Sequence, residues 1–437
     1  MPAVDLRPQS LHGARSGRRA TGAPARNLPQ AAAVSRAVLI AASRYRRHSY
    51  GNNHPLDIPR VSLTVDLIRA YAALDPDEYL PSRRATVAEL EWFHTRDYVS
   101  AMQRCEALGK VTDRYRHRHN IGNLENPWFH DFFSTPATAT GGSIQAAEQV
   151  LAGRAAFSPA GGMHHAMPDR AQGFCFFNDT ALAVMRLRRE GLRVLYVDID
   201  AHHGDGVEAA LRDDAEAFTL SLHMDAEYAY PFAGGRSEDC GPQANAFNLP
   251  LPRGTNDSEY RHAFNRVWPA VLDAVRPDVL VLQAGTDPIM PDPLGKFRLS
   301  TQLFLEIVAR VLADAPRQAN GTPRVAVTGG GGYHPLILAR AWTGVWGLLS
   351  GRTLSEEIPP AGQELLAAVE WGADEYDDDE EEELERAGTP YRELLTHRID
   401  RPHEGEIRAQ IDARVDTLLD AHPRLRRRGV AASGGTV

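Results

Sequence analysis

The sequence predicts an α/β fold of three layers (α/β/α), in which helices cover both faces of a mostly parallel central β-sheet. The first observation behind this prediction is a set of short runs that are apolar throughout, as strands buried on both faces of a parallel sheet are. These runs span residues 38–43, 193–199, 217–223, 278–285 and 324–330. The second observation is that helix-like stretches alternate with them, which is typical of βαβ units.

Each expected helix has apolar residues at three- and four-residue intervals, so that one of its faces can pack on the sheet. In chain order these helices are 139–153, 178–191, 257–275, 300–315 and 335–349. Several of the strands end in residues capable of chemistry, which read DIDAHH, SLH, QAGTD and GGGGYH. Because ligands of parallel sheets bind beyond the carboxyl ends of the strands, we expect the functional site there.

Composition argues against several classes of protein. The 437 residues carry a formal net charge of −9, much of it from an acidic run at 373–385, whereas non-specific nucleic-acid binding needs a basic face. No apolar run reaches the ~18 to 20 residues that span a membrane. The three cysteines, Cys105, Cys175 and Cys240, include no CxxC pair, which indicates a reducing compartment, and we expect the protein in the cytoplasm.

The chain divides into three expected parts. Residues 1–36 are rich in Arg, Ala and Pro and lack an apolar core, which predicts a flexible tail, although an organellar transit peptide has a similar composition. Residues 37–352 contain the strand and helix patterns and form the expected catalytic domain. Residues 353–437 hold the acidic run and a helix-like, Arg-rich end. We interpret them as a C-terminal extension rather than a second catalytic domain.

The segment VDIDAHHGDGV at 197–207 suggests a metal site. Asp200 and His202 stand two positions apart, and side chains at i and i+2 of a strand face the same side. With Asp287, at the end of QAGTD, they would supply one imidazole and two carboxylates from two strand ends. Three ligands with room for water are the layout of a catalytic metal rather than of a closed structural site. Asp198 faces the same side and would either ligate or orient another group.

Two adjacent histidines, His164 and His165, follow a Gly-Gly turn in PAGGMHHAM. Adjacent imidazoles point in different directions, so each needs its own partner, and Asp198 and Asp205 are two spare acids. A carboxylate bonded to one ring nitrogen makes an imidazole a better base. Two such pairs beside a metal and its water would suit hydrolysis.

Four glycines precede Tyr333 in TGGGGYH. A glycine run lets the backbone approach a ligand closely, and the phenol could donate a hydrogen bond to a carbonyl oxygen on which negative charge develops. The run does not predict a phosphate loop, because GxxxxGK[ST] and GxGxxG followed by an acid are both absent.

Six motifs, in order, resemble the zinc-dependent histone deacetylase superfamily. They read PAGGMHHA, GFCFFND, DIDAHHGDGV, LSLH, QAGTD and GGGGY, and NHPLDIPR at 53–60 resembles an early segment of the same family. The superfamily includes bacterial acetoin-utilisation proteins and acetylpolyamine amidohydrolases, all on the arginase-like α/β fold. The likeness covers residues 38–349 and implies this arginase- or deacetylase-like fold.

The resemblance implies a role for each of the residues singled out above. Asp200, His202 and Asp287 match the ligands of one zinc ion. His165 matches the general base and acid, with Asp205 as its partner, and His164 matches an electrostatic neighbour paired with Asp198. Tyr333 matches the residue that polarises the acyl carbonyl. The positions around a structural potassium ion are matched by Asp198, Asp200, His202, Ser221 and Leu222.

The walls of the family's narrow acyl-lysine tunnel are matched by Gly173, Phe174 and Tyr230, where the family often has Phe in place of Tyr230. Glu125 is the candidate for a rim carboxylate, with a spacing that differs by about one residue. Leu294 matches a position where a polyamine-specific relative carries an acidic residue. The segment DPIMPDPL also departs from the family, because Pro288 and Pro291 stiffen it and remove amide donors.

The sequence therefore predicts a zinc-dependent deacylase that hydrolyses N-acyl (acetyl) amides, with acyl-lysine in a protein or peptide as substrate. An acetylpolyamine or small-molecule amidohydrolase of the same superfamily is the first alternative. A dimanganese ureohydrolase would need more carboxylates, such as a D-x-D pair, which QAGTDPIMPD lacks. A catalytically silent acyl-binding protein would have lost a ligand, a histidine or Tyr333, and none is missing.

Overall fold

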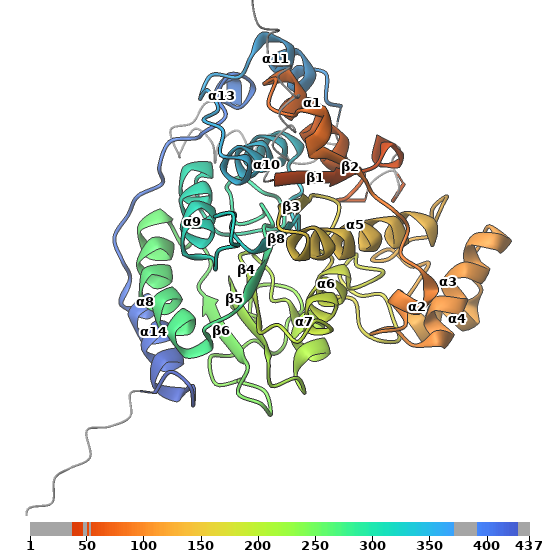
Figure 1. The fold of residues 1–437 in the computed structure, drawn as a ribbon, viewed down its shortest axis with the longest axis horizontal. Helices are drawn as coiled ribbons and strands as arrows, with labels where there is room; N and C mark the ends of the chain where they lie inside the picture. The colour runs from red at the N-terminus through yellow and green to blue at the C-terminus, as the bar shows by residue number, and fades with distance from the viewer. Residues whose placement is uncertain (1–36, 47–49, 52–53, 371–390, 427–437) are drawn as a thin grey trace, which may run out of the picture. The chain divides into compact units, whose positions relative to one another are not determined.

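The centre of the fold is a sheet of eight strands that all pair in parallel. The computed structural model describes residues 37–46, 50–51, 54–370 and 391–426. Within them the strand order is β2-β1-β3-β8-β7-β4-β5-β6 (Figure 1). The strands span Ala37–Ala41 (β1), Tyr79–Pro81 (β2), Ala155–Ser158 (β3), Val194–Asp198 (β4), Ala217–Met224 (β5), Ala246–Leu251 (β6), Val279–Gln283 (β7) and Val325–Thr328 (β8).

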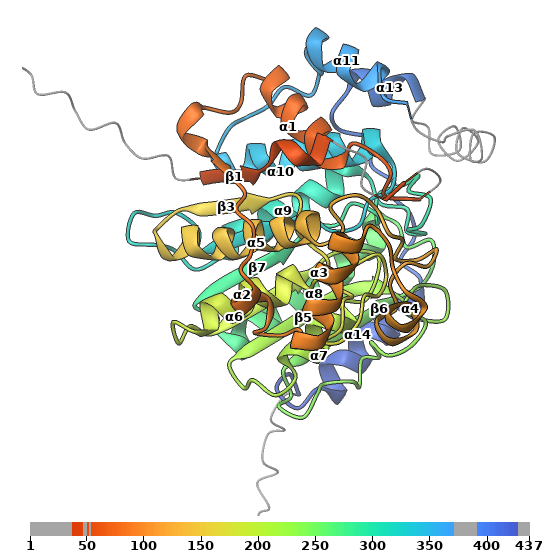
Figure 2. The same ribbon diagram turned by 90° about the vertical axis from the view of Figure 1, so that its right-hand side faces the viewer.

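Helices cover both faces of the sheet (Figures 1 and 2). They span Arg60–Ala70 (α1), Val87–Leu90 (α2), Arg96–Leu108 (α3), Asp113–His119 (α4), Ser134–Leu151 (α5), Asp179–Arg188 (α6), Asp205–Leu211 (α7), Asp257–Val275 (α8), Thr301–Asp314 (α9), Pro335–Ser350 (α10), Pro360–Ala367 (α11), Tyr391–Thr396 (α13) and Ala409–Ala421 (α14). Two short 3₁₀ helices, Ser43–Arg46 and Pro76–Glu78, flank β1 and β2.

The side chains of a strand alternate between two apolar cores. In β4, Leu195 and Val197 belong to a core that contains α1, α8, α9 and α10, whereas Val194 and Tyr196 belong to a core that contains α5, α6 and α7. This alternation is the reason that the strands read as apolar throughout. The predicted three-layer α/β fold is confirmed, and the sheet is parallel throughout.

The predicted helices correspond to α5, α6, α8, α9 and α10, and the predicted strands to β1, β4, β5, β7 and β8. Strands β2, β3 and β6 were not predicted. The first two have only three and four residues. Strand β6 contains Asn248 and Pro250, and it lies at the edge of the sheet, where a strand tolerates proline.

The segment after residue 352 shares the core of the strands. Ile358, Leu366, Leu394, Ile411 and Val415 are buried in the first core, and the described residues belong to one compact unit. In Figure 1, α14 lies beside α8 and β6, which it contacts. The expected N-terminal tail at 1–36 and the acidic run at 373–385 lie outside the described residues.

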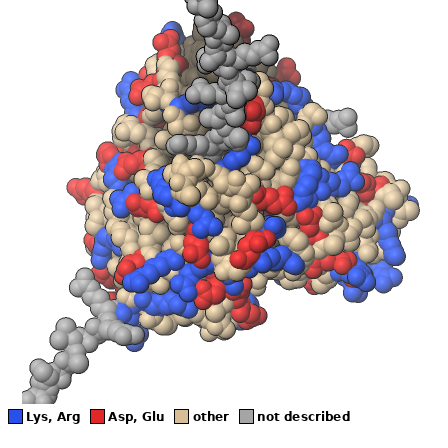
Figure 3. All heavy atoms as spheres, in the orientation of Figure 1, with Lys and Arg blue, Asp and Glu red and all other residues tan. Residues whose placement is uncertain are grey.

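Among the described helices, none is both long enough and apolar enough to cross a membrane. On the face shown in Figure 3, basic and acidic side chains are interspersed. Cys105, Cys175 and Cys240 form no disulfide.

Candidate active site

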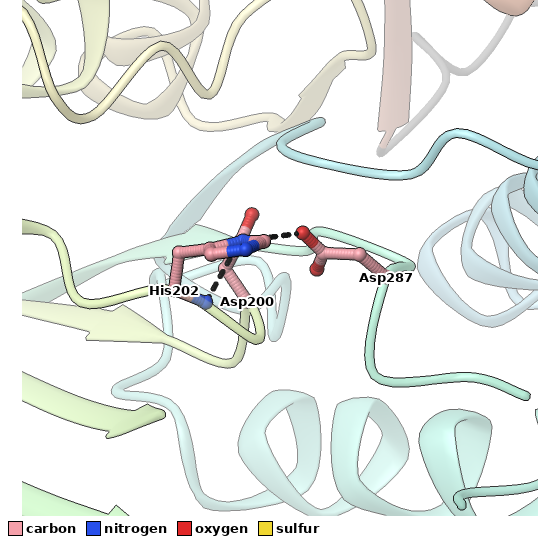
Figure 4. A group of neighbouring side chains, drawn as sticks. All are labelled: Asp200, His202 and Asp287. Atoms are coloured by element: carbon pink, nitrogen blue, oxygen red, sulfur yellow. Dashed lines mark hydrogen bonds and ion pairs between the residues drawn. The ribbon is translucent and has the colours of Figure 1, made fainter. Parts of the chain in front are cut away.

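Asp200, His202 and Asp287 converge beyond the carboxyl ends of β4 and β7, which are neighbours in the sheet (Figure 4). Nδ1 of His202 lies 3.1 Å from Oδ1 of Asp200 and 2.9 Å from Oδ2 of Asp287. All three residues are buried. Among the described residues, this is the one group of three or more His, Cys, Asp or Glu side chains whose ligand atoms lie within 4.8 Å of one another.

The second oxygen of each carboxylate is held by a donor from the surrounding loops. Gln283 Nε2 and the Gly331 amide each donate to Asp200 Oδ2 at 2.7 Å, and the Ala201 amide donates to Asp287 Oδ1 at 2.9 Å. Position 331 requires glycine, because a Cβ there would lie 2.1 Å from Asp287 Oδ2. The other oxygen of each carboxylate thereby faces the imidazole of His202, and that of Asp200 also accepts the His202 amide at 3.0 Å.

Two carboxylates are buried here, and neither pairs with Lys or Arg within the described part of the chain. Burial and the charge of Asp200 raise the pKa of Asp287 to about 7. Burial also opposes ionisation of Asp200, but His164 and His202 outweigh it and lower its pKa. Buried charges of this kind are stable when they coordinate a metal. One imidazole and two carboxylates are a donor set that suits a divalent transition-metal ion.

Each of the two adjacent histidines has a carboxylate of its own. His164 Nδ1 lies 2.9 Å from Asp198 Oδ2, and His165 Nδ1 lies 2.8 Å from Asp205 Oδ1. The Nε2 atoms of the two rings are 3.0 Å apart. The structure therefore brings together both expected His–Asp pairs, next to the three convergent side chains.

The surroundings of the two imidazoles shift their pKa values in opposite directions. Burial opposes protonation of His164, but Asp198 and Asp200 outweigh it and raise its pKa to about 9. Burial and the charges of His164 and His202 hold the pKa of His165 well below its ordinary value. These shifts favour the protonated form of His164 and the neutral form of His165, with the hydrogen between the two Nε2 atoms on His164.

A pocket of about 300 Å³ leads to these groups. His165, His202 and Tyr333 line it. So does every wall residue expected from the sequence, namely Glu125, Gly173, Phe174, Tyr230 and Leu294. The ring of Tyr230 packs edge-on against that of His165, with centroids 4.8 Å apart. Gly173 has a φ of +55°, and a Cβ there would lie 2.4 Å from His165 Cδ2, so a side chain would displace the imidazole.

Glu125 joins two walls of the pocket. Its Oε1 accepts hydrogen bonds from the Gly173 amide at 2.7 Å and from the Tyr230 hydroxyl at 3.1 Å. Its Oε2 accepts one from Asn120 Nδ2 at 3.0 Å. The hydroxyl that distinguishes Tyr230 from the Phe common in the family thus has a partner within the pocket wall.

The proline-containing loop after Asp287 is organised by Asp292. Its carboxylate accepts hydrogen bonds from the amides of Leu294 at 2.9 Å, Gly295 at 3.0 Å and Tyr333 at 2.7 Å. The buried carboxylate supplies acceptors that link this loop to the glycine run, so Leu294 and Tyr333 reach the same pocket.

The residues matched to a potassium site come from the adjacent ends of β4 and β5. Asp198 and Ser221 are partners in the register of the two strands, and Leu222 follows Ser221. The Ser221 hydroxyl lies 2.8 Å from His223 Nδ1. The structure thus places Asp198, Ser221 and Leu222 on neighbouring strands, and the other two members of the set, Asp200 and His202, belong also to the three convergent side chains.

Sequence reasoning missed four residues that support the site. Tyr196 donates to Asp198 Oδ2 at 2.6 Å, and Gln172 donates to Asp205 Oδ2 at 2.6 Å. Gln283 donates a hydrogen bond to Asp200. The buried guanidinium of Arg60 donates to the Gly330 carbonyl and lies over the Trp342 ring. Three of them had a signal in the sequence: Tyr196 stands two positions before Asp198 and so shares its face, Gln283 opens QAGTD, and Arg60 ends NHPLDIPR.

Comparison with known proteins agrees with this geometry. Residues 54–349 match the family model of the histone deacetylase domain. The chain is 33% identical over 329 residues to the acetoin utilization protein AcuC of Bacillus subtilis, covering 74% of this chain and 84% of that protein. It is 35% identical over 306 residues to histone deacetylase 8 of Xenopus tropicalis, covering 69% of this chain and 80% of that one.

A solved structure of a histone deacetylase (HDAC) homolog from Aquifex aeolicus superposes with a TM-score of 0.80 at 39% identity, covering 88% of this chain and 99% of that one. A structure of an HDAC homolog complexed with SAHA superposes with a TM-score of 0.79. The expected deacetylase-like fold is therefore confirmed, and the chain belongs to the histone deacetylase family.

Proposed function

We propose that this protein is a zinc-dependent deacylase that hydrolyses N-acyl (acetyl) amides, with acyl-lysine in a protein or peptide as its substrate. One observation carries the proposal: His165, Tyr333 and His202 line one pocket, and His202 converges there with Asp200 and Asp287. Membership of a deacetylase family supports the same reaction.

Asp200, His202 and Asp287 would hold one zinc ion, since two carboxylates and an imidazole leave coordination positions open. Zinc in such a site supplies a Lewis acid that polarises a carbonyl and makes water a better nucleophile. We also propose a structural potassium ion near Asp198, Asp200, His202, Ser221 and Leu222, held largely by backbone oxygens.

His165 acts as the general base. Its Nδ1 hydrogen is donated to Asp205, so its Nε2 is the atom that would take the proton of the attacking water, in place of the hydrogen bond that it shares with His164 Nε2 in this structure. The Tyr333 hydroxyl donates a hydrogen bond to the substrate oxygen as it becomes negative, and the positive charge of His164 favours the same charge development. The proton then passes from the histidine pair to the departing amine.

The pocket suits the stem of an acyl-lysine. Phe174 and Tyr230 form aromatic walls for the methylenes, and Leu294 brings no charge to the mouth. Glu125 already accepts three hydrogen bonds from the protein, so it is poorly placed to serve as a free anion for a second ammonium. These features favour a peptide or protein over an acetylpolyamine, which is the first alternative substrate. The free cysteines support a cytoplasmic location.

The remaining alternatives have less support. A dimanganese ureohydrolase needs a second set of ligands, but the described residues contain one group, and His164 and Asp198 are bonded to each other. A silent binding protein is disfavoured because every catalytic side chain is retained in place.

The decisive experiment is an assay of the purified protein, stripped with a chelator and then restored with zinc. The substrates are acyl-lysine peptides of increasing acyl length and N-acetylated polyamines. We expect hydrolysis of the peptides that depends on zinc and is abolished by His165→Ala. Absence of hydrolysis with every amide, at full zinc occupancy, would refute the proposal.

A further inference from the structure

We infer that Arg414, on the C-terminal helix α14, is a positioning residue for the substrate pocket. This inference rests on the proposed function, because it concerns access to the same pocket. It assigns a role to a segment outside the part of the chain that matches the family model, which ends at residue 349.

The loop between β5 and β6, residues 225–245, contains no helix or strand. It carries four residues that line the pocket: Tyr228, Ala229, Tyr230 and Phe232. Tyr228 and Phe232 are 53% and 67% exposed, so burial contributes little to holding them. The loop also borders a cleft of about 660 Å³, lined by Asp225, Phe232 and Arg236 among others. Ala229 and Ser237 are buried, and His223 lies 3.0 Å from the Gly235 carbonyl, so the loop also has anchors in the body of the domain. Packing holds Tyr228 and Phe232 themselves weakly, and their position depends on where the two ends of the loop are anchored.

Helix α14 anchors the start of the loop. The guanidinium of Arg414 forms a short ion pair with Asp225 Oδ2, and both side chains are partly shielded from solvent. The other oxygen of Asp225 accepts the amide of Glu227 at 3.1 Å, which turns the chain toward Tyr228. The ion pair thus holds the residue from which the loop leaves the sheet.

The segment that ends α14 anchors the other end of the same loop. Arg424 donates to the carbonyls of Ala244 at 2.7 Å and Gln243 at 3.1 Å. His422 lies 3.1 Å from the Ala246 carbonyl and stacks on Phe247. One C-terminal segment therefore holds both ends of the loop that forms one side of the pocket.

Helix α14 is itself fixed to the body of the domain, so it can hold the two ends of the loop in place. Ile411, Val415 and Leu418 are fully buried against the core. Arg266 of α8 pairs with Asp412 at 2.7 Å and with Asp416 at 2.6 Å. The buried residues fix α14, the exposed pairs of Arg266 add little to that, and neither pair touches the loop, so Arg266 provides a matched control.

The test compares Arg414→Ala with Arg266→Ala in the full-length protein. For Arg414→Ala we expect faster hydrogen–deuterium exchange at residues 226–236, a KM for the acetyl-lysine peptide raised about threefold or more, and a kcat within about twofold, as loss of a partly exposed ion pair would give. Arg266→Ala should leave loop exchange and KM unchanged. Arg414→Lys, or the swapped pair Arg414→Asp with Asp225→Arg, should bring loop exchange and KM most of the way back to the wild-type values.

Two results would overturn the inference: unchanged exchange of the loop in Arg414→Ala, or the same change in Arg266→Ala. Exchange is measured without substrate. If the protein hydrolysed no amide, the proposed function would fail while the role of Arg414 in holding the loop would still be decided.

Discussion

The imidazoles of His164 and His165 are hydrogen-bonding neighbours through their Nε2 atoms, 3.0 Å apart, although each is tied through Nδ1 to a different carboxylate. Only one proton fits between two nitrogens at this distance. The opposite shifts of their pKa values favour the proton on His164, whose carboxylate partner Asp198 is fully buried, and a neutral His165. Two adjacent histidines thus differ in the direction of their pKa shifts because their surroundings differ.

The first prediction concerns pH. Burial raises the pKa of Asp205 to about 7, and the ionised form is the better acceptor for the Nδ1 hydrogen of His165. Because Asp205 is charged above this pKa and neutral below it, kcat/KM should fall as the pH drops below about 7. A pH–rate profile measures this limb, and Asp205→Asn should remove it while lowering the plateau. Burial also raises the pKa of Glu208 to about 7, so Glu208→Gln is the control, and it should retain the limb.

The second prediction concerns the oxyanion. Tyr333→Phe removes one hydrogen-bond donor and keeps the ring, and such a loss costs ~100- to 1,000-fold in kcat. His165→Ala should be at least as damaging because the proton acceptor is lost. Steady-state kinetics on the same peptide, with melting temperatures to show intact folding, give the comparison. Near-normal turnover in both variants would contradict the proposed chemistry.

The third prediction concerns the metal. Elemental analysis should find one zinc per active site in the wild-type protein and little in His202→Ala or Asp287→Asn. His203→Asn alters the adjacent imidazole, which faces Glu208, and should keep the metal. Two manganese ions per active site would instead favour the ureohydrolase alternative.

The fourth prediction concerns substrate class. We expect kcat/KM for an acetyl-lysine peptide to exceed that for N-acetylated putrescine and spermidine at equal salt. Leu294→Glu adds an anion to the pocket lining and should shift the ratio toward polyamines. A wild-type preference for the polyamine of more than about tenfold, or ~1.4 kcal/mol, would overturn the choice of acyl-lysine.

The fifth prediction concerns stability. Asp400 pairs with Arg340 of α10 and accepts hydrogen bonds from the amide and hydroxyl of Thr301 at the start of α9, all in the core. Asp400→Asn leaves a buried guanidinium without its counter-charge and should lower the free energy of unfolding by about 3 to 5 kcal/mol. Glu393→Gln, which breaks the exposed pair with Arg401, should cost less than about 1 kcal/mol. Urea denaturation distinguishes the two.

The same ion pair has a pH dependence with a definite sign. Burial opposes ionisation of Asp400, but Arg340 outweighs it and lowers the pKa of the carboxyl in the folded state. Its contribution to stability is therefore complete above the pKa of the unfolded chain, ~3.9, and is lost as the pH falls through the lower folded value. Asp400→Asn should remove this part of the acid sensitivity.

The sequence by itself determined the features that depend on short-range periodicity. Apolar runs and helical spacing predicted five strands, five helices and a parallel sheet, because burial on both faces of a sheet leaves a local pattern. The spacing of Asp200 and His202 predicted a shared face, and ordered motifs predicted the family and the residues that now surround one pocket. Strand β6 was missed because an edge position, not its own composition, permits Asn248 and Pro250.

Only the tertiary structure decided which distant residues meet. Nothing in the spacing of Glu125 and Tyr230 shows that the carboxylate accepts a hydrogen bond from the phenol hydroxyl. Likewise, nothing near Asp205 in the sequence predicts its hydrogen bond with Gln172. The same holds for Arg414 and Asp225, which are 189 positions apart. Such pairs depend on the path of the whole chain: a local pattern records which face is buried, but the partner across the interface is chosen by how strands, loops and the C-terminal helix pack together.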